Sequence, residues 1–173
     1  MPENCRFSNR IGLHSPKQPC FHRRVLGSRT FIKYWLPVIA WMLLIFFGSS
    51  DLLSSERTSR FLGPLLRWLI PDISAETIRQ VQLLTRKAAH LIEYAILALL
   101  LWRARRQDRP RPWTWPEAGV VLSLTVLYAV TDELHQGLVA SRYCSAADVL
   151  VDAVGSALGL VLLWSVGRWR KRW

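Results

Sequence analysis

Long apolar blocks separated by polar and basic segments dominate the pattern of this chain. Because an α-helix needs about 20 residues to cross the hydrocarbon of a bilayer, we expect membrane-spanning helices over residues 31–50, 83–102, 118–139 and 145–166. The first and fourth blocks are the most continuous, whereas the second and third carry ionisable residues that lower their hydropathy. The pattern predicts an all-α integral membrane protein, a four-transmembrane-helix bundle.

The connection between the first two blocks is the longest, and its pattern predicts structure. Within residues 56–70, six apolar residues (Phe61, Leu62, Leu65, Leu66, Trp68 and Leu69) alternate with Arg57, Arg60 and Arg67. This predicts a short amphipathic segment at the outer membrane interface, kinked at Pro64 and ended by Pro71. Ser74 suits the cap of a helix that begins near Ala75 and runs through the second block to about Arg105. The alternative is a loop with incidental apolar content.

Composition narrows the class of protein. The chain has 173 residues, of which 51% are hydrophobic, with nine Trp and a formal net charge of +11. Such basicity is also typical of nucleic-acid-binding proteins. Here, however, the Lys and Arg residues cluster beside the apolar blocks, where they set topology and meet lipid headgroups. We therefore expect the lipid bilayer as a partner and no nucleic acid.

The distribution of Lys and Arg predicts the orientation, because positively charged flanks stay in the cytoplasm. The N-terminal tail carries seven, the second connection five and the C-terminal tail four, whereas the third connection carries only Arg142. The first connection, with six, opposes this assignment, but the total of sixteen against seven still favours cytoplasmic N- and C-termini.

The N-terminal tail is expected to be disordered. It has no apolar core of a signal peptide, so the first block should remain as a signal anchor. The spacing of Cys5, His14, Cys20 and His22 matches no standard zinc pattern. Cys144 is expected to be a small interface residue, and a thiol nucleophile beside His135 is the alternative.

Polar residues recur at one depth in the four blocks. His90, Glu93 and Tyr94 follow i, i+3, i+4 spacing, Asp132, His135 and Gln136 repeat it, and Asp148 with Asp152 is i, i+4. Each set therefore shares one side of its helix. At about 1.5 Å of rise per residue, the three sets and Ser49–Ser50 fall in the outer half of a ~30 Å core, with Glu93 nearer the midplane. This predicts one shared polar site, and Gly155 and Gly159 continue its fourth face as a small-xxx-small contact.

Four segments together resemble the VanZ-like family. They are 47–50 (FGSS), 87–95 (KAAHLIEYA), 128–136 (YAVTDELHQ) and 148–155 (DVLVDAVG), the last preceded by Arg142. The resemblance covers residues 34–163, although family members often have Pro-Gly where this chain has Ala140-Ser141 before Arg142. The family is named for a bacterial membrane protein associated with low-level teicoplanin resistance. The resemblance implies a multi-pass protein of the bacterial cytoplasmic (inner) membrane and an effect on glycopeptide susceptibility.

The chain is accordingly divided into a basic cytoplasmic tail at 1–30, a four-helix membrane domain at 31–167 and a basic cytoplasmic tail at 168–173. The expected site lies near the extracytoplasmic face. Its main candidates, listed with a second tier, are His90, Asp132, His135, Arg142 and Asp152, then Lys87, Glu93, Glu133, Gln136 and Asp148.

Three functions fit such a site. The polar residues could form a structural network that fixes helix register. They could form an enzyme site for a lipid-linked substrate, with His90 or His135 as general base, Asp132 or Asp152 orienting it and Arg142 or Lys87 holding a phosphate. They could also bind an envelope amphiphile, such as a lipid-linked precursor headgroup or a glycopeptide. No cofactor is predicted, a divalent metal on the His and Asp residues stays an alternative, and transport with so few helices would require an oligomer.

Overall fold

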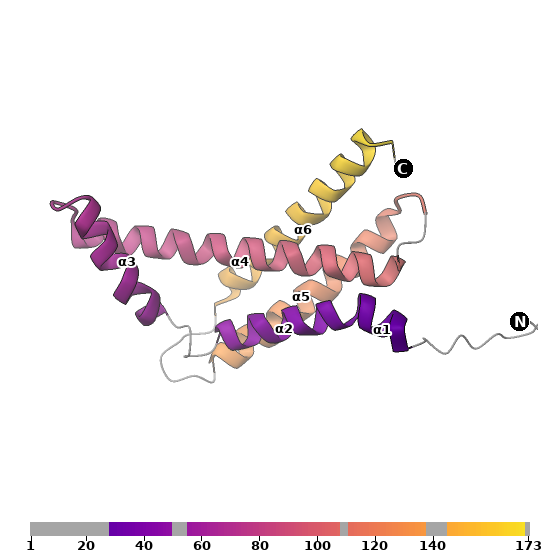
Figure 1. Ribbon diagram of the computed structural model, residues 1–173, viewed down its shortest axis with the longest axis horizontal. Coiled ribbons are helices and arrows are strands. Elements are labelled where there is room, and N and C mark those ends of the chain that lie inside the picture. The colour runs from indigo at the N-terminus through magenta and orange to yellow at the C-terminus, as the bar shows by residue number, and fades with distance from the viewer. Residues whose placement is uncertain (1–27, 50–54, 108–110, 138–144, 172–173) are drawn as a thin grey trace, which may run out of the picture.

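The computed structural model describes residues 28–49, 55–107, 111–137 and 145–171, and its elements in this part of the chain are helices without strands. They are α1 (Ser28–Tyr34), α2 (Leu36–Ser49), α3 (Ser55–Leu69), α4 (Ala75–Arg106), α5 (Trp115–Gly137) and α6 (Ala146–Trp169). In Figure 1, α1 and α2 lie end to end below α4, while α5 and α6 cross α4 obliquely. The all-α class is confirmed, and helices occupy all four predicted blocks.

The first predicted span differs in one respect, because the helix is interrupted at Trp35 between α1 and α2. Pro37 lies just beyond the interruption and has no amide hydrogen to donate back to the preceding turn. Helical bonds nevertheless flank it, with the Trp35 amide donating to Phe31 O at 2.8 Å and the Ile39 amide to Trp35 O at 3.0 Å. The break is therefore local.

The helix α4 begins and ends where its sequence signals predict. The Thr77 amide donates to Ser74 Oγ at 3.1 Å, which caps the start of the helix. Gln107 closes the end in the left-handed conformation, and its amide donates to Arg103 O at 2.9 Å. Near the start, hydrogen bonds from Arg79 hold the pKa of the Glu76 carboxyl below its ordinary value. With 32 residues, α4 is about 48 Å long and exceeds the ~30 Å hydrocarbon core of a bilayer.

The amphipathic segment of the first connection is the helix α3, and Pro64 lies inside it. It packs against α4 and crosses the N-terminal part of that helix in Figure 1. Three of its apolar side chains stay exposed, namely Leu65, Trp68 and Leu69. The predicted helix is confirmed, and its apolar face is left open by the part of the protein that the structure describes.

The helices α4 and α6 run in the same direction and form the most extensive contact. Gly155 and Gly159 bring their backbones together: a Cβ built on Gly155 would lie 2.5 Å from Leu91 O, and one on Gly159 would lie 2.8 Å from Ala95 O. The predicted small-xxx-small contact is thus confirmed, and its partner is α4. Only glycine permits this approach.

The apolar core connects this pair with α2 and α5. Two interhelical hydrogen bonds hold α2, because Trp41 Nε1 donates to Glu93 O at 2.9 Å and Tyr128 Oη donates to Met42 O at 2.6 Å. The buried apolar residues include Val38, Ile45, Tyr94, Leu97, Ala98, Leu101, Val121, Ala129 and Leu160. This packing fixes the rotation of each helix, and so the direction in which its polar face is turned.

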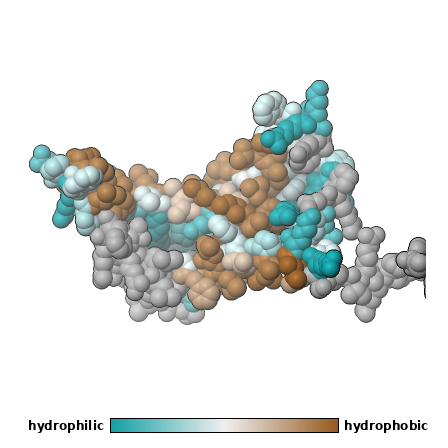
Figure 2. Space-filling view, viewed as in Figure 1, coloured by the Kyte–Doolittle hydropathy of each residue, from teal (hydrophilic) through white to brown (hydrophobic). Residues whose placement is uncertain are grey.

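The outward faces of the helices are apolar. Figure 2 shows hydrophobic side chains over the middle of the molecule and hydrophilic ones at the end that holds the α6 C-terminus. Of the described helices, only α6 is both long and apolar enough to cross a membrane by itself, and 28% of its apolar window is buried. Length and composition thus support one crossing, at the position of the fourth predicted span.

Candidate functional site

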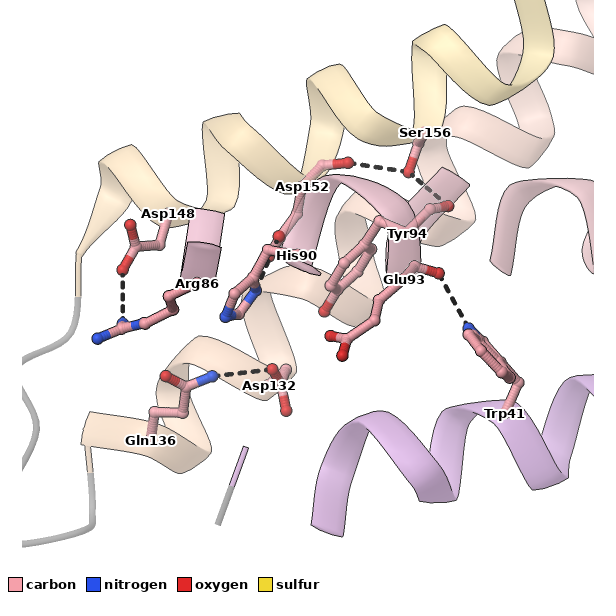
Figure 3. A network of polar contacts seen from close by, with 10 residues as sticks. All are labelled: Trp41, Arg86, His90, Glu93, Tyr94, Asp132, Gln136, Asp148, Asp152 and Ser156. Atoms are coloured by element: carbon pink, nitrogen blue, oxygen red, sulfur yellow. Dashed lines mark hydrogen bonds and ion pairs between the residues drawn. The ribbon is translucent and has the colours of Figure 1, made fainter. Parts of the chain in front are cut away.

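Two parallel pairs join α4 to α6. Arg86 Nη2 donates to Asp148 Oδ2 at 3.1 Å, and His90 Nδ1 lies 3.1 Å from Asp152 Oδ1 (Figure 3). The two pairs lie one helical turn apart, because both partners step by four residues along parallel helices. The α4–α6 contact therefore sets the register of both pairs.

The His90–Asp152 pair lies deeper than the Arg86–Asp148 pair. The side chain of Asp152 is 2% exposed and that of His90 13%, against 20% for Asp148 and 36% for Arg86. An ionised carboxylate only accepts, so the hydrogen of this bond belongs to Nδ1 of His90. Its Nε2 makes no hydrogen bond within the described ranges. Asp152 thus orients an imidazole whose second nitrogen is left for another partner.

The end of α5 supplies two further buried carboxylates. Gln136 Nε2 donates to Asp132 Oδ2 at 3.0 Å, and both residues are buried. Glu133 instead points to α6, where its Oε1 accepts from the Ser145 amide at 2.6 Å. Ser145 makes no side-chain cap bond of its own. Glu133 therefore caps the N-terminus of α6, which favours a negative charge there.

Tyr94 and Glu93 leave polar groups unmatched. The Tyr94 side chain is fully buried, at 0% exposed, and its hydroxyl has no hydrogen-bond partner among the described residues. The Glu93 carboxylate is half-buried and, in the same part of the chain, accepts no hydrogen bond. In Figure 3 both groups point toward Asp132 from the side of His90. We call His90, Glu93, Tyr94, Asp132, Gln136 and Asp152 the polar cluster.

Other sequence candidates lie elsewhere. The His135 ring stacks on Phe46 of α2, with centroids 4.2 Å apart and planes at 19°. Its helical spacing with Asp132 therefore did not bring it to His90. Lys87 is exposed on α4. Arg142 and Cys144 lie outside the described residues.

Sequence reasoning missed several contacts of the site. Arg86 was counted only toward the charge balance, and the roles of Trp41, Tyr128 and Ser156 were not predicted. Ser156 Oγ donates to Asp152 O at 3.0 Å and lies 3.4 Å from Tyr94 O, which joins α6 to α4 beside the cluster. One signal was available: Arg86 precedes His90 by the same four residues by which Asp148 precedes Asp152.

The cluster can hold a hydrogen-bonding ligand or move a proton. Within the described ranges, no three His, Cys, Asp or Glu side chains are grouped as ligands of one metal ion. Each of the three carboxylates of the cluster (Glu93, Asp132 and Asp152) brings two acceptor oxygens, and together these outnumber the N–H and O–H donors of His90, Tyr94 and Gln136. Such a set is complementary to a group that donates hydrogen bonds.

Comparison with known proteins identifies a family. No curated protein and no solved structure matches the chain. The profile of the VanZ/LLP1 family matches residues 34–167, well over half of the sequence and all of the polar cluster. The chain therefore belongs to the VanZ/LLP1 family.

Proposed function

We propose that the protein crosses the cytoplasmic membrane four times, with both termini in the cytoplasm, and binds the polar headgroup of an envelope amphiphile in the polar cluster. The ligand class comprises lipid-linked precursor headgroups and lipoglycopeptides. Through such binding the protein would alter glycopeptide susceptibility, as the family resemblance implies.

Helix length and burial support four crossings. The helices α4, α5 and α6 have 32, 23 and 24 residues, and α1 with α2 covers residues 28–49. Each is long enough for a bilayer, which needs about 20 residues. The charges that lower the hydropathy of α5 are buried, since Asp132 and Glu133 are each 3% exposed. Lipid would therefore meet the apolar faces of these helices.

The observation that carries the binding proposal is the buried Tyr94 hydroxyl without a partner beside the Glu93 carboxylate. In a purely structural network, nearly every buried polar atom is satisfied internally. An unmatched hydroxyl and an unmatched carboxylate that point into one cluster favour a missing polar partner. Because carboxylates predominate, we expect that partner to present an amine or hydroxyl, and we expect Arg142 and Lys87 to meet any phosphate or carboxylate that it carries.

Calorimetric titration in nanodiscs tests this proposal. Teicoplanin serves as the lipoglycopeptide probe in phosphatidylcholine discs, and phosphatidylethanolamine discs supply an amine headgroup. Glu93→Gln and Tyr94→Phe should each weaken binding of the recognised probe about tenfold, or about 1.4 kcal/mol. Glu76→Gln, at an exposed carboxylate on the same helix, should leave affinity unchanged. Failure of the wild-type protein to bind either probe, or equal affinity in all variants, would refute the proposal.

The His90–Asp152 pair favours a second candidate function, general-base catalysis on a lipid-linked envelope substrate. A carboxylate that orients an imidazole is the arrangement that lets the other nitrogen take a proton from water. His90→Gln should abolish turnover of purified lipid-linked precursors, whereas His135→Gln should retain it, since that ring stacks on Phe46. Absence of turnover by the wild-type protein leaves binding as the function.

A further inference from the structure

A second site lies where α4 ends, α5 begins and α6 ends, away from the polar cluster (Figures 1 and 3). Two neighbouring open pockets share Pro112 there. One, of about 480 Å³, is lined mainly by Arg105, Arg111, Thr114 and Glu117. The other, of about 360 Å³, is lined by Trp113, Trp115, Trp164 and Arg168. Both volumes fall in the range of about 300–1,000 Å³ that small-ligand sites occupy.

Arg106 anchors the backbone at Pro112, the residue that lines both pockets. Its side chain is 5% exposed, donates to Arg111 O and to Pro112 O, the latter at 2.9 Å, and lies over the Trp102 ring at 4.8 Å. A buried guanidinium therefore holds the Arg111–Pro112 backbone in place. This makes Arg106 a positioning residue, and it leaves Arg111 free to project from a fixed backbone.

The lining is strongly basic. Arg105, Arg111 and Arg168 are exposed around the pockets, and Glu117 is the lining carboxylate among the described residues. That carboxylate lies 4.0 Å from Arg106 Nε, so its charge is already balanced by a buried guanidinium. The remaining three guanidiniums favour an anion, and Arg binds phosphate oxygens in a bidentate manner.

Aromatic and apolar side chains surround the charges. Trp102 stacks on Trp113 with centroids 4.2 Å apart, and Trp115 lies 5.9 Å from Trp164. Trp is enriched at the headgroup level of membranes. From the pocket toward the C-terminus of α5, three exposed apolar residues at helical spacing form a stripe: Val120, Leu124 and Leu127. The first of them, Val120, also lines the pocket. A ligand with a phosphate and an acyl chain would meet both features.

We propose that this basic, Trp-lined pocket binds the phosphodiester headgroup of an anionic phospholipid, with an acyl chain along the Val120–Leu127 stripe. The site is distinct from the polar cluster and needs a different ligand charge. It would hold a lipid of the cytoplasmic leaflet in the proposed topology. A soluble phosphate ester has no acyl chain that could contact the stripe, so the stripe favours a lipid as the ligand.

Native mass spectrometry of the full chain in detergent tests the proposal with equal amounts of phosphatidylglycerol and phosphatidylcholine. The wild-type protein should retain phosphatidylglycerol with at least about tenfold preference. The double variant Arg105→Gln/Arg111→Gln should lose that preference. Arg103→Gln/Arg170→Gln removes the same charge from exposed positions at the same end, outside both pockets, and should keep it.

Two outcomes would overturn the proposal. Equal loss of preference in both double variants would assign the effect to general surface charge. Displacement of phosphatidylglycerol by millimolar glycerol phosphate would assign the pocket to soluble phosphate esters. Because Arg105 and Arg111 are exposed, the pocket variant should fold, and thermal unfolding with the charge-matched control verifies this.

Discussion

Two tyrosines on facing helices show how the surroundings of one residue decide its role. The rings of Tyr94 and Tyr128 lie 6.3 Å apart. The Tyr128 hydroxyl donates to Met42 O at 2.6 Å, whereas the buried Tyr94 hydroxyl has no partner in the part of the chain that the structure describes. The same functional group is thus structural at one position and available at the other.

Removing these hydroxyls should therefore have opposite effects on stability. Tyr94→Phe removes a desolvated group without a bond, and we expect stability of the ligand-free protein to rise or hold, by about 0–1 kcal/mol. Tyr128→Phe leaves a carbonyl without its donor and should cost about 1 kcal/mol. Thermal unfolding in detergent measures both. A clear loss of stability in Tyr94→Phe would show that the hydroxyl has an internal partner.

Two arginine ion pairs of α4, a half-buried pair with α6 and an exposed pair within α4, should also differ. Arg86→Gln leaves the Asp148 carboxylate, 20% exposed, without its partner, and we expect a loss of about 1 kcal/mol. Arg79→Gln breaks a pair whose side chains are 69% and 55% exposed, and its effect should be smaller, because solvent screens an exposed ion pair. Equal effects in thermal unfolding would mean that the Arg86–Asp148 pair adds no more stability than an exposed ion pair does.

The spacing of polar residues predicted this site only in part. Steps of three and four residues put His90 and Glu93 on one side of α4, and Asp148 and Asp152 on one side of α6, because a helix fixes which residues share a face. Spacing does not fix the rotation of a helix about its axis, which packing determines. The ring of His135 accordingly meets Phe46 of α2, although its spacing with Asp132 had predicted a place in the shared site.

At the scale of elements, boundaries followed local signals closely. The Ser74 cap and the apolar period predicted α4 almost to the residue, whereas the interruption at Trp35 depends on a proline that an apolar count does not register. The partner of the glycine face was not predictable from α6 alone. It required the three-dimensional arrangement, in which α4 and α6 pack although α5 lies between them in the chain.

Alanine substitutions at two glycines should separate packing from backbone effects. At Gly155 an added Cβ would lie 2.5 Å from Leu91 O and 2.8 Å from Leu91 Cα, so Gly155→Ala should force the helices apart and cost about 2 kcal/mol or more. At Gly119 nothing lies within 4 Å. Gly119→Ala should stabilise α5 by about 0.5–1 kcal/mol through lower chain entropy. Thermal unfolding tests both, and tolerance of Gly155→Ala would contradict the close α4–α6 contact.

At the scale of the whole molecule, the two ends of the helix bundle differ. The N-terminus of α1, the C-terminus of α4, the start of α5 and the end of α6 gather at one end in Figure 1, with most of the basic residues that the structure describes. The polar cluster lies away from that end, near the end of α5, the start of α6 and the middle of α4. The orientation expected from the sequence is based on the same Lys and Arg residues, which flank the apolar blocks at these helix ends.

Labelling of single cysteines in intact cells tests the proposed orientation. In a background of Cys5→Ser, Cys20→Ser and Cys144→Ser, Arg79→Cys near the start of α4 should react with a membrane-impermeant maleimide. Trp169→Cys, whose parent side chain is 82% exposed at the end of α6, should react only after lysis. The reverse pattern would invert the proposed topology, and labelling of both positions in intact cells would contradict an odd number of crossings between them.

The contact between α4 and α6 also sets an order for biosynthesis. Because α6 leaves the ribosome after α4 and α5 and carries both the glycine face and Asp152, Leu91 and Ala95 lack their neighbour and His90 lacks its carboxylate until α6 has been made. The helix α5 is made between them, and its packing must leave room for α6 to reach α4. In a chain truncated before α6, the face of α4 that α6 normally covers would be exposed to quality-control proteases. Such a chain would also lack a complete polar cluster.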